Sequence, residues 1–252
     1  MSFMNHNTTR DFLYGWVDGV WASAAQRRLA LFLIVMTILF FVVLPVLPML
    51  KGWYWPLTHE TYRYAILASH FTEAFNEGVL YPRWLPDIMG GYGLPVFVFY
   101  QPGFFFLALP FELLFGHPMV TSGMALLAML SIGGMGAYRM CRRFGGPALG
   151  LLGTCLFLLT PYIYLDVAVR GAWSELLACM FLPWVIFFLI GLREDAIAGK
   201  MPLLSVGGLG LGLAMVVISH PVVAIFCAIM MCVLAAGLVA ELWQKKQFYL
   251  YF

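Results

Sequence analysis

Glu60 is the residue whose position suggests chemistry most directly. It lies in KGWYWPLTHETYRYAILASHFTEAFNEG (51–78), where Thr58 is expected to cap the start of a helix. At about 100° per residue, Glu60 falls over the apolar side of that helix, where the amphipathic rule predicts no charge. In a first helical turn, the dipole and the free amides favour an ionised carboxylate, which could act as a general base. The alternative is a structural carboxylate at a helix N-terminus.

A second group of candidate binding residues follows in GVLYPRWLPDIMGGYGLPVFVFYQPG (78–103). Its prolines prevent a long helix, and the glycines at 90, 91 and 93 allow tight turns, so a shaped loop is expected. Arg83 and Asp87 could make polar contacts. The aromatic rings could stack on sugars or cover a lipid, or could form an aromatic belt at a membrane interface; they are Tyr81, Trp84, Tyr92, Phe97, Phe99 and Tyr100.

The composition places these residues in an integral membrane protein. Of the 252 residues, 63% are hydrophobic and 10% are charged, and the mean hydropathy is +0.90. An ordinary soluble domain is only about half apolar. The net charge of +2 is dispersed, so it indicates no nucleic-acid partner. None of the five cysteines falls in the long polar loop, so neither a disulfide framework nor a cysteine-based metal site is expected.

Charge-poor runs predict an all-α, polytopic membrane fold with about six transmembrane helices. The run 29–50 is uncharged and long enough to cross roughly 30 Å of hydrocarbon. Further runs of sufficient length follow at about 119–138, 147–165, 175–192, 201–219 and 222–242. The run 103–115 is too short to span and contains Pro110 and Glu112, so it is expected to lie in the membrane interface.

The positions of lysine and arginine predict the orientation of these helices. The basic segments RMCRRF (139–144), LREDAIAGK (192–200) and WQKKQ (243–247) all face the cytoplasm in a six-span topology, as the positive-inside rule favours. Both termini are then cytoplasmic. Residues 1–28 are expected to form a cytoplasmic segment with an in-plane amphipathic helix over 13–24. Residues 29–252 are expected to form a single transmembrane domain with a large outer loop at 51–118.

Helical spacing gives two further expectations. The helix after Thr58 should lie flat on the membrane and end at Gly78. Its apolar arc holds Tyr64, Leu67, Phe71, Ala74 and Phe75, and its polar arc holds Arg63, His70, Glu73 and Glu77. The glycines at 207, 208, 210 and 212 lie in an apolar run with no preceding strand, so we expect close helix packing through Gly208 and Gly212 rather than nucleotide binding.

The order of these motifs resembles the GT-C superfamily of membrane glycosyltransferases. The resemblance is closest to a bacterial branch of multispan proteins that carries a "6-pyruvoyl-tetrahydropterin synthase related" membrane domain. It covers about residues 50–221, which correspond to the N-terminal part of such proteins. The matching segments are THETYRY (58–64), the loop 78–103, YRMCRRFGG (138–146), TPYIYLDVAVRGAWSELLA (160–178) and SHP (219–221).

The resemblance implies an enzyme of the bacterial plasma (inner) membrane that transfers a sugar from a polyprenyl-phosphate donor. Its site would face the noncytoplasmic side, and its acceptor would be a lipid, a glycan or a protein. In that superfamily an acidic residue of the first outer loop acts as the base or orients the acceptor, and Glu60 matches it by position, although Asp is commoner there. A short second outer loop at about 163–175, with Asp166, Arg170 and Glu175, would close the pocket. Arg170 or Arg63 would hold the leaving phosphate.

The resulting candidate site has one catalytic residue, Glu60, and a set of substrate-binding residues. That set is His59, Arg63, Arg83, Trp84, Asp87, Tyr92, Tyr100, Asp166, Arg170, Glu175 and His220. For several of them a structural role stays open, because Arg170 could pair with Asp166 or Glu175, Arg63 could lie among lipid headgroups, and His220 could cap a helix. No cofactor is expected. A divalent metal held by His59, Glu60 or Asp87 is conceivable, but no ligand spacing demands one.

A second hypothesis from another class stays open. The chain could be a non-catalytic accessory or structural subunit of a larger membrane complex, derived from a truncated GT-C module. The expected partners are membrane lipids and a polyprenyl-phosphate sugar, together with other membrane subunits under the second hypothesis, and no nucleic acid.

Overall fold

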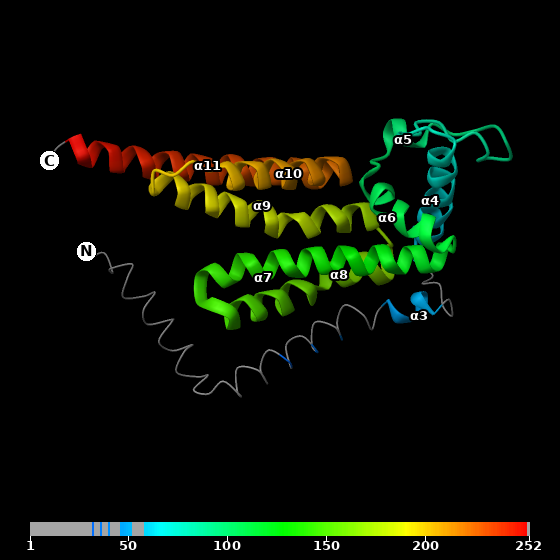
Figure 1. The fold of residues 1–252 in the computed structure, drawn as a ribbon, viewed down its shortest axis with the longest axis horizontal. Coiled ribbons are helices and arrows are strands. Elements are labelled where there is room, and N and C mark those ends of the chain that lie inside the picture. Colours follow the sequence, from blue (N-terminus) through cyan, green and yellow to red (C-terminus); the bar gives the residue numbers. More distant parts are fainter. Residues whose placement is uncertain (1–31, 33–35, 37–39, 41–45, 52–57, 251–252) are drawn as a thin grey trace.

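The computed structural model describes residues 32, 36, 40, 46–51 and 58–250, and this part of the chain is mainly helical (Figure 1). Its one strand-like pairing is an isolated bridge between Leu85 and Leu94. The predicted all-α class is therefore confirmed. The in-plane helix expected at 13–24 and most of the span expected at 29–50 lie outside the described residues. All five cysteines are free thiols.

The helices follow one another with short connections, apart from the loop between α4 and α5. In chain order they are α3 (Leu47–Leu50), α4 (Thr61–Asn76), α5 (Val96–Phe99), α6 (Gly103–Phe115), α7 (Pro118–Leu158), α8 (Pro161–Leu165), the π-helical turn η1 (Asp166–Arg170), α9 (Trp173–Ile197), α10 (Leu203–Ser219) and α11 (Pro221–Leu250).

Three of the described helices are long and apolar enough to cross a membrane. They are α7, α9 and the Pro221–Glu241 part of α11. Two shorter apolar helices, α6 and α10, accompany them. These helices agree with the composition in making the chain a membrane protein. The runs 175–192, 201–219 and 222–242, which were expected to span, coincide with α9, α10 and the first part of α11.

Helix α7 is a hairpin of two arms rather than a single rod (Figure 1). The chain reverses at Gly145 and Gly146, and Gly146 has φ 70° and ψ −166°, which favours glycine. The arms pack against each other, with Thr154 Oγ1 donating a hydrogen bond of 3.2 Å to the Gly134 carbonyl. The two runs expected at 119–138 and 147–165 correspond to the first arm and to the second arm continued by α8.

Glycines bring α10 close to α9, as predicted. A methyl group added at Gly208 would collide with the Phe188 ring, and one at Gly212 would lie 3.1 Å from Val185 Cγ2. The neighbouring Gly207 and Gly210 have nothing within 4 Å of such a methyl group. The glycines at 208 and 212 therefore serve close helix packing, and the prediction is confirmed.

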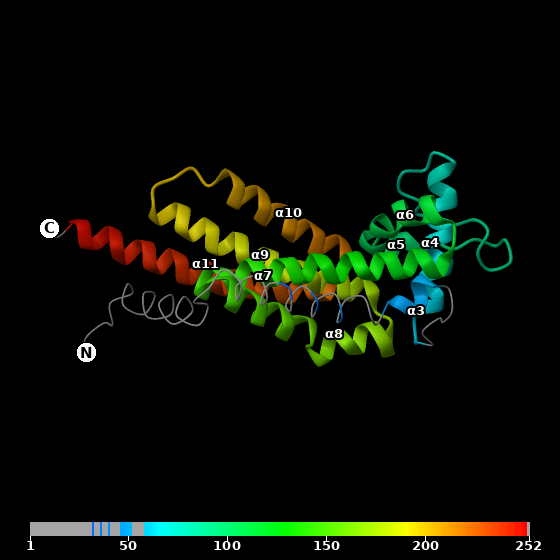
Figure 2. The same ribbon diagram turned by 60° about the horizontal axis from the view of Figure 1, so that its bottom comes forward.

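Helix α4 lies across one end of the long helices in both views (Figure 1, Figure 2). The predicted arcs are confirmed, since its inner residues Tyr64, Leu67, Phe71 and Ala74 are buried while Arg63, Glu73 and Glu77 are exposed. The expected start is corrected by two residues. Glu60 is the N-cap residue and its side chain caps no amide, whereas the Thr58 hydroxyl accepts a bond of 3.0 Å from the Thr61 amide.

Helix α6 packs its inner side into the core, which its uniformly apolar sequence did not indicate. Phe104, Phe105 and Ala108 are fully or almost fully buried among α4, α7 and α9. Glu112 is also buried, and its Oε1 accepts a hydrogen bond of 3.0 Å from Ser69 on α4. Helices α4 and α6 together form a cap over the end of the bundle, and this cap carries one wall of the candidate site.

Candidate functional site

One cavity gathers most of the polar residues that the sequence singled out. It has a volume of about 260 Å³ and lies where the start of α4, the end of α5, η1, the start of α9 and the α10–α11 turn meet. Its lining residues are His59, Glu60, Arg63, Tyr64, Tyr100, Arg170, Ala172, Glu175 and His220. Seven of the twelve predicted site residues thus share one cavity, and Asp166 adjoins it as the ion-pair partner of Arg170.

Backbone hydrogen bonds fix Glu60 at the edge of this cavity. The amide of His59 donates to the Val169 carbonyl at 3.2 Å, and the amide of Glu60 donates to the Arg170 carbonyl at 3.1 Å. Gly171 allows this close approach, because its φ is 67° and a Cβ there would collide with the Thr58 hydroxyl. The segment that leads into α4 is therefore held against η1 by main-chain contacts.

Replacing Gly171 by Ala is expected to separate these two segments and to destabilise the protein by about 2–4 kcal/mol. The left-handed backbone and the collision with Thr58 both oppose a methyl group. Gly199→Ala is the matched control, because Gly199 has φ 62° but open space around it, and it should cost only about 1 kcal/mol. Chemical unfolding in detergent measures both. Equal losses would show that the contact with Thr58 contributes nothing.

Glu60 and Arg63 face the cavity with little to immobilise them. Arg63 Nη1 lies 3.3 Å from Glu60 Oε2, and the two side chains are 52% and 39% exposed, so the pair is worth little. The Arg63 guanidinium also lies over the Tyr100 ring, 4.9 Å from its centroid. A ligand that offers Arg63 a better anion could therefore release the Glu60 carboxylate at small cost.

Arg170 sits in a denser network of charges than the sequence could specify. Its Nη1 donates to Asp166 Oδ1 and its Nη2 donates to Glu175 Oε2, both at 2.7 Å. Tyr162 accepts a weaker bond of 3.2 Å from Nη1 and donates to Glu175 Oε1. The sequence left open that Arg170 pairs with Asp166 or Glu175, and the structure shows both ion pairs.

Asp166 is the most deeply buried charge of this network. Its side chain has no exposed surface, and its Oδ2 has no hydrogen-bond partner in the described part of the chain. Burial and the neighbouring Glu175 charge raise the pKa of Asp166 to about 6, although the Arg170 charge acts in the opposite direction. Arg170 therefore favours the ionised form of Asp166.

A pair of tyrosine hydroxyls directs a hydrogen-bond donor toward the cavity. The buried Tyr64 hydroxyl accepts a bond of 3.0 Å from the Ser174 amide and lies 2.7 Å from the Tyr100 hydroxyl. If Tyr100 were the donor of this pair, the buried proton of Tyr64 would have no partner, at a cost of about 1–3 kcal/mol. Tyr64 therefore donates to Tyr100, and the proton of Tyr100 remains available to a ligand.

His220 forms another wall of the cavity and also contacts the start of α11. Its Nδ1 accepts a hydrogen bond of 3.4 Å from the Val223 amide, so the proton of the neutral ring resides on Nε2. Burial lowers the pKa of His220, which keeps the ring neutral at pH 7. His220 thus has the capping role that the sequence left open, and it adds no charge to the cavity.

Four predicted site residues do not reach the cavity: Arg83, Trp84, Asp87 and Tyr92. The loop that carries them closes on itself, because Leu85 and Leu94 exchange both backbone hydrogen bonds at 3.0 Å. Positive φ angles at Met89, Gly90, Gly91 and Gly93 make the turn. Trp84 packs over Gly93, and Tyr92 is 88% exposed at the tip. The loop is shaped, as expected, but its contribution to the cavity is Tyr100 alone.

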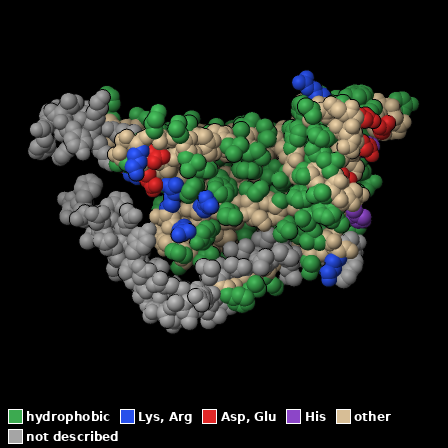
Figure 3. All heavy atoms as spheres, viewed as in Figure 1, with side chains coloured by type: hydrophobic (Ala, Val, Ile, Leu, Met, Phe, Trp, Pro, Cys, Tyr) green, Lys and Arg blue, Asp and Glu red, His purple; other side chains and the backbone are tan. Residues whose placement is uncertain are grey.

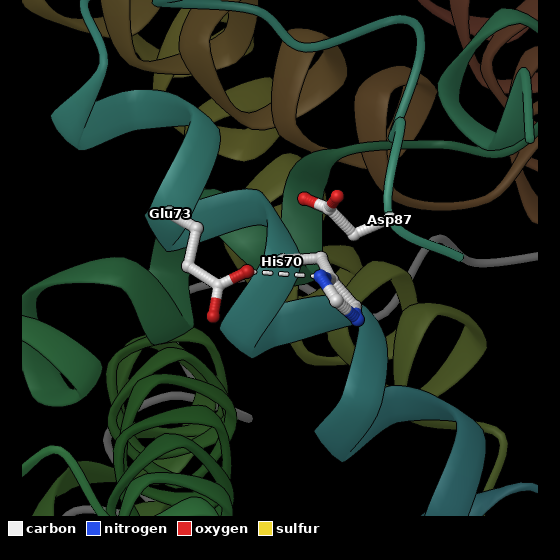
Figure 4. A group of neighbouring side chains, drawn as sticks. All are labelled: His70, Glu73 and Asp87. Atoms are coloured by element: carbon white, nitrogen blue, oxygen red, sulfur yellow. Dashed lines mark hydrogen bonds and ion pairs between the residues drawn. The ribbon is translucent and has the colours of Figure 1, made fainter. Parts of the chain in front are cut away.

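Asp87 instead comes together with His70 and Glu73 of α4 (Figure 4). One ligand atom from each of these three residues lies within 4.8 Å of the others, an arrangement that could hold a metal ion. The His70 Nδ1 already pairs with Glu73 Oε2 at 2.9 Å, and both carboxylates are exposed. This group is the only one of its kind among the described residues, and it includes neither Glu60 nor His59.

The sequence reasoning missed two tyrosines of the site. Tyr64 was assigned to the apolar arc of its helix, and nothing in the pattern indicated that its hydroxyl bonds to residues of α9 and α5. Tyr162 was detectable, because Tyr162, Asp166 and Arg170 are spaced four residues apart and so share one helix face.

A second, apolar cavity of about 280 Å³ adjoins the polar one between α9 and α11. Glu175 lines both cavities. The apolar one continues along the two helices and is lined by Tyr162, Glu175, Cys179, Leu182, Val222, Val223, Phe226, Cys227 and Met230. The polar cavity thus has an apolar neighbour of the kind that accepts a hydrocarbon chain.

Comparison with known proteins adds no relative. No protein-family model matches the chain, and neither the curated proteins nor the solved structures include a significant match.

Proposed function

We propose that the polar cavity is the active site of a membrane glycosyltransferase that uses a polyprenyl-phosphate-linked sugar. The observation that carries the proposal is the shared cavity of Glu60 and Arg63, a carboxylate and a guanidinium that are only weakly paired, beside an apolar groove between α9 and α11. A site for a lipid-linked phosphodiester needs a cation, a base and a path for the lipid tail, and these residues supply all three.

In the proposed reaction, Glu60 accepts the proton of the acceptor hydroxyl while that oxygen attacks the anomeric carbon of the sugar. The bond from the anomeric carbon to the phosphate oxygen breaks, and polyprenyl phosphate leaves with the electron pair of that bond. Arg63 can hold the phosphate by two-point contact, since Arg170 is engaged by carboxylates. The Tyr100 hydroxyl can donate a further hydrogen bond.

The dimensions of α9 fit a site at a membrane surface. From Glu175 to Glu194 is 19 residues, or roughly 29 Å along a helix, close to the hydrocarbon thickness of about 30 Å. No charged residue intervenes before Arg193. The polar cavity beside Glu175 therefore lies at the headgroup level of one leaflet when α9 spans. We propose that this is the noncytoplasmic leaflet, because the basic segments lie at the other end.

The direct test of donor binding is Arg63→Gln with Arg83→Gln as the matched control. Loss of the charged contact to phosphate should weaken donor binding about 10- to 100-fold, whereas Arg83 lies outside the cavity and its variant should bind normally. The measurement is the transfer of radiolabelled sugar from undecaprenyl-phosphate-linked sugars in reconstituted vesicles, with the donor concentration varied. Equal donor dependence in the two variants would remove Arg63 from the proposed site.

The accessory-subunit hypothesis is favoured by the exposed surface of α11. Only 12% of its most apolar stretch, within Pro221–Glu241, is buried inside the protein. The exposed side chains include Val222, Ile225, Phe226, Ile229 and Val233. A second subunit could cover this surface, as lipid could. Purification in mild detergent distinguishes the accessory-subunit hypothesis from the glycosyltransferase hypothesis. A stoichiometric complex with unrelated membrane proteins, free of bound polyprenyl phosphate, would favour the subunit.

A further inference from the structure

A basic pocket lies at the opposite end of the helices from the proposed active site. It has a volume of about 460 Å³ between the first arm of α7 and the last part of α9. Its lining residues are Met135, Tyr138, Arg139, Arg142, Arg143 and Phe187. Figure 3 shows Lys and Arg side chains gathered over this end of the bundle, where α7 turns back and α9 ends. We refer to it as the arginine pocket.

Aromatic rings hold the three guanidinium groups of the arginine pocket in place. Arg143 lies over Phe187 at 4.0 Å, Arg139 lies over Trp184 at 5.7 Å, and Arg142 lies over Tyr138 at 5.9 Å. Trp184 is itself fixed by a hydrogen bond of 2.9 Å to the Ile132 carbonyl. Cation–π contacts of this kind orient a guanidinium while leaving its N–H edge free to donate.

The positive charge of the pocket is only partly compensated. Arg143 pairs with Glu194 at 2.8 Å. Arg139 and Arg142 are exposed, and in the described part of the chain neither forms an ion pair. Among the described ion pairs, only Arg143–Glu194 joins one of these three guanidinium groups to a carboxylate, and the N–H donors of the other two are available to an anion.

The position and the lining of the pocket favour a lipid headgroup as the anion. Glu194, which pairs with Arg143, lies roughly one hydrocarbon thickness from Glu175 along α9, so the pocket is at a membrane surface. Met135 is 52% exposed and lies one helical turn from Arg139, toward the middle of the span. Tyr138 and Phe187 extend this apolar wall. Such a surface suits a phosphate joined to acyl chains better than a fully hydrated inorganic ion.

We propose that the arginine pocket binds the phosphodiester headgroup of an anionic phospholipid. Arg139 and Arg142 donate to the phosphate oxygens, Arg143 adds positive charge, and the apolar wall contacts the glycerol and the first part of the acyl chains. This binding is independent of the proposed glycosyl transfer, since the two sites lie at opposite ends of α9.

The test uses native mass spectrometry of the full chain with added dioleoyl-phosphatidylglycerol. Each arginine near an anionic lipid contributes roughly fivefold in affinity, so Arg139→Gln/Arg142→Gln should weaken binding about thirtyfold. Arg83→Gln at the other end should leave it unchanged. Dioleoyl-phosphatidylcholine, which carries no net charge, should bind the unaltered protein more weakly than phosphatidylglycerol does.

Two further measurements make the outcome decisive. Thermal unfolding in phosphatidylcholine alone shows whether the double variant is folded. If the double variant is unfolded, the single variants Arg139→Gln and Arg142→Gln are measured instead. Inorganic phosphate at equal concentration distinguishes a free anion from a headgroup. The proposal is overturned if phosphatidylglycerol binds the arginine variants as tightly as the unaltered protein, or if inorganic phosphate displaces the lipid at similar concentration.

Discussion

Glu60→Gln is expected to lower the rate of sugar transfer by about 10²–10⁴-fold while leaving the fold and donor binding intact. Glutamine has nearly the same shape as glutamate but cannot accept the proton of the acceptor hydroxyl. The fold should tolerate the change, because the side chain of Glu60 caps no helix amide and its pair with Arg63 is exposed. The backbone contact that positions residue 60, from its amide to the Arg170 carbonyl, is unaffected.

The control is Glu77→Gln, the same substitution at the other end of α4. Glu77 is exposed and lies outside the cavity, so this variant should transfer sugar at the normal rate. A loss confined to kcat in Glu60→Gln indicates a group that acts in the transition state, whereas a rise in KM alone indicates a binding role. Full activity of Glu60→Gln would remove this residue from the mechanism.

Arg170→Gln is expected to destabilise the protein by about 2–4 kcal/mol, because it leaves the fully buried Asp166 without its counter-charge. Glu175 loses its partner as well. This loss is smaller than for a fully buried pair, because the Arg170 side chain is 37% exposed and water partly screens its charge. Arg193→Gln is the matched control, because Arg193 forms a bidentate pair with Glu241 at the surface, and its loss should cost less than about 1 kcal/mol.

The dependence on pH identifies Asp166 as the origin of this loss. The pKa of Asp166 is about 6 in the folded protein, against 3.8 for an exposed aspartate. Between about pH 4 and 6 the folded protein therefore keeps a proton that the unfolded chain has already released. Stability from this group is therefore greatest at low pH and falls as the pH rises through 6. Removing Arg170 raises the pKa of Asp166 further, so the deficit of Arg170→Gln should grow between about pH 5.5 and pH 8.

A double-mutant cycle with Asp166→Asn completes this test. If the unpaired charge of Asp166 causes the loss, Arg170→Gln/Asp166→Asn should recover much of the stability that Arg170→Gln loses, and its pH dependence should disappear. Unfolding by denaturant in detergent gives the four stabilities. Additive losses that do not vary with pH would show that Arg170 acts by packing rather than through Asp166.

Most of the helical framework could be predicted from local signals. Runs free of charge give the long helices, and the arcs of α4 follow from helical spacing, as its buried Tyr64 and Phe71 show. Glycine at 208 and 212 indicates close packing because only a missing side chain allows it. These properties depend on single segments, so one sequence is enough to specify them.

The assembly of the site depends on contacts between distant segments, which a single sequence specifies poorly. Glu60 and Arg170 meet because Gly171 permits a hydrogen bond between their main chains. No local sequence signal near either residue predicts this contact. The loop residues Arg83, Trp84, Asp87 and Tyr92 were predicted to line the site because their chemistry suits sugar binding. The loop closes on itself through the bridge between Leu85 and Leu94, and these four residues do not line the cavity. Residue type alone therefore cannot distinguish the residues that line the cavity from the loop residues that lie outside it.

The most direct test of the proposed site is a structure of the protein in lipid with a non-hydrolysable phosphonate analogue of an undecaprenyl-phosphate-linked sugar. The proposal predicts the phosphonate beside Arg63, the sugar within reach of Glu60 and Tyr100, and the prenyl chain between α9 and α11. A cavity closed by the side chains of a partner protein, or an analogue bound elsewhere with this cavity empty, would contradict it.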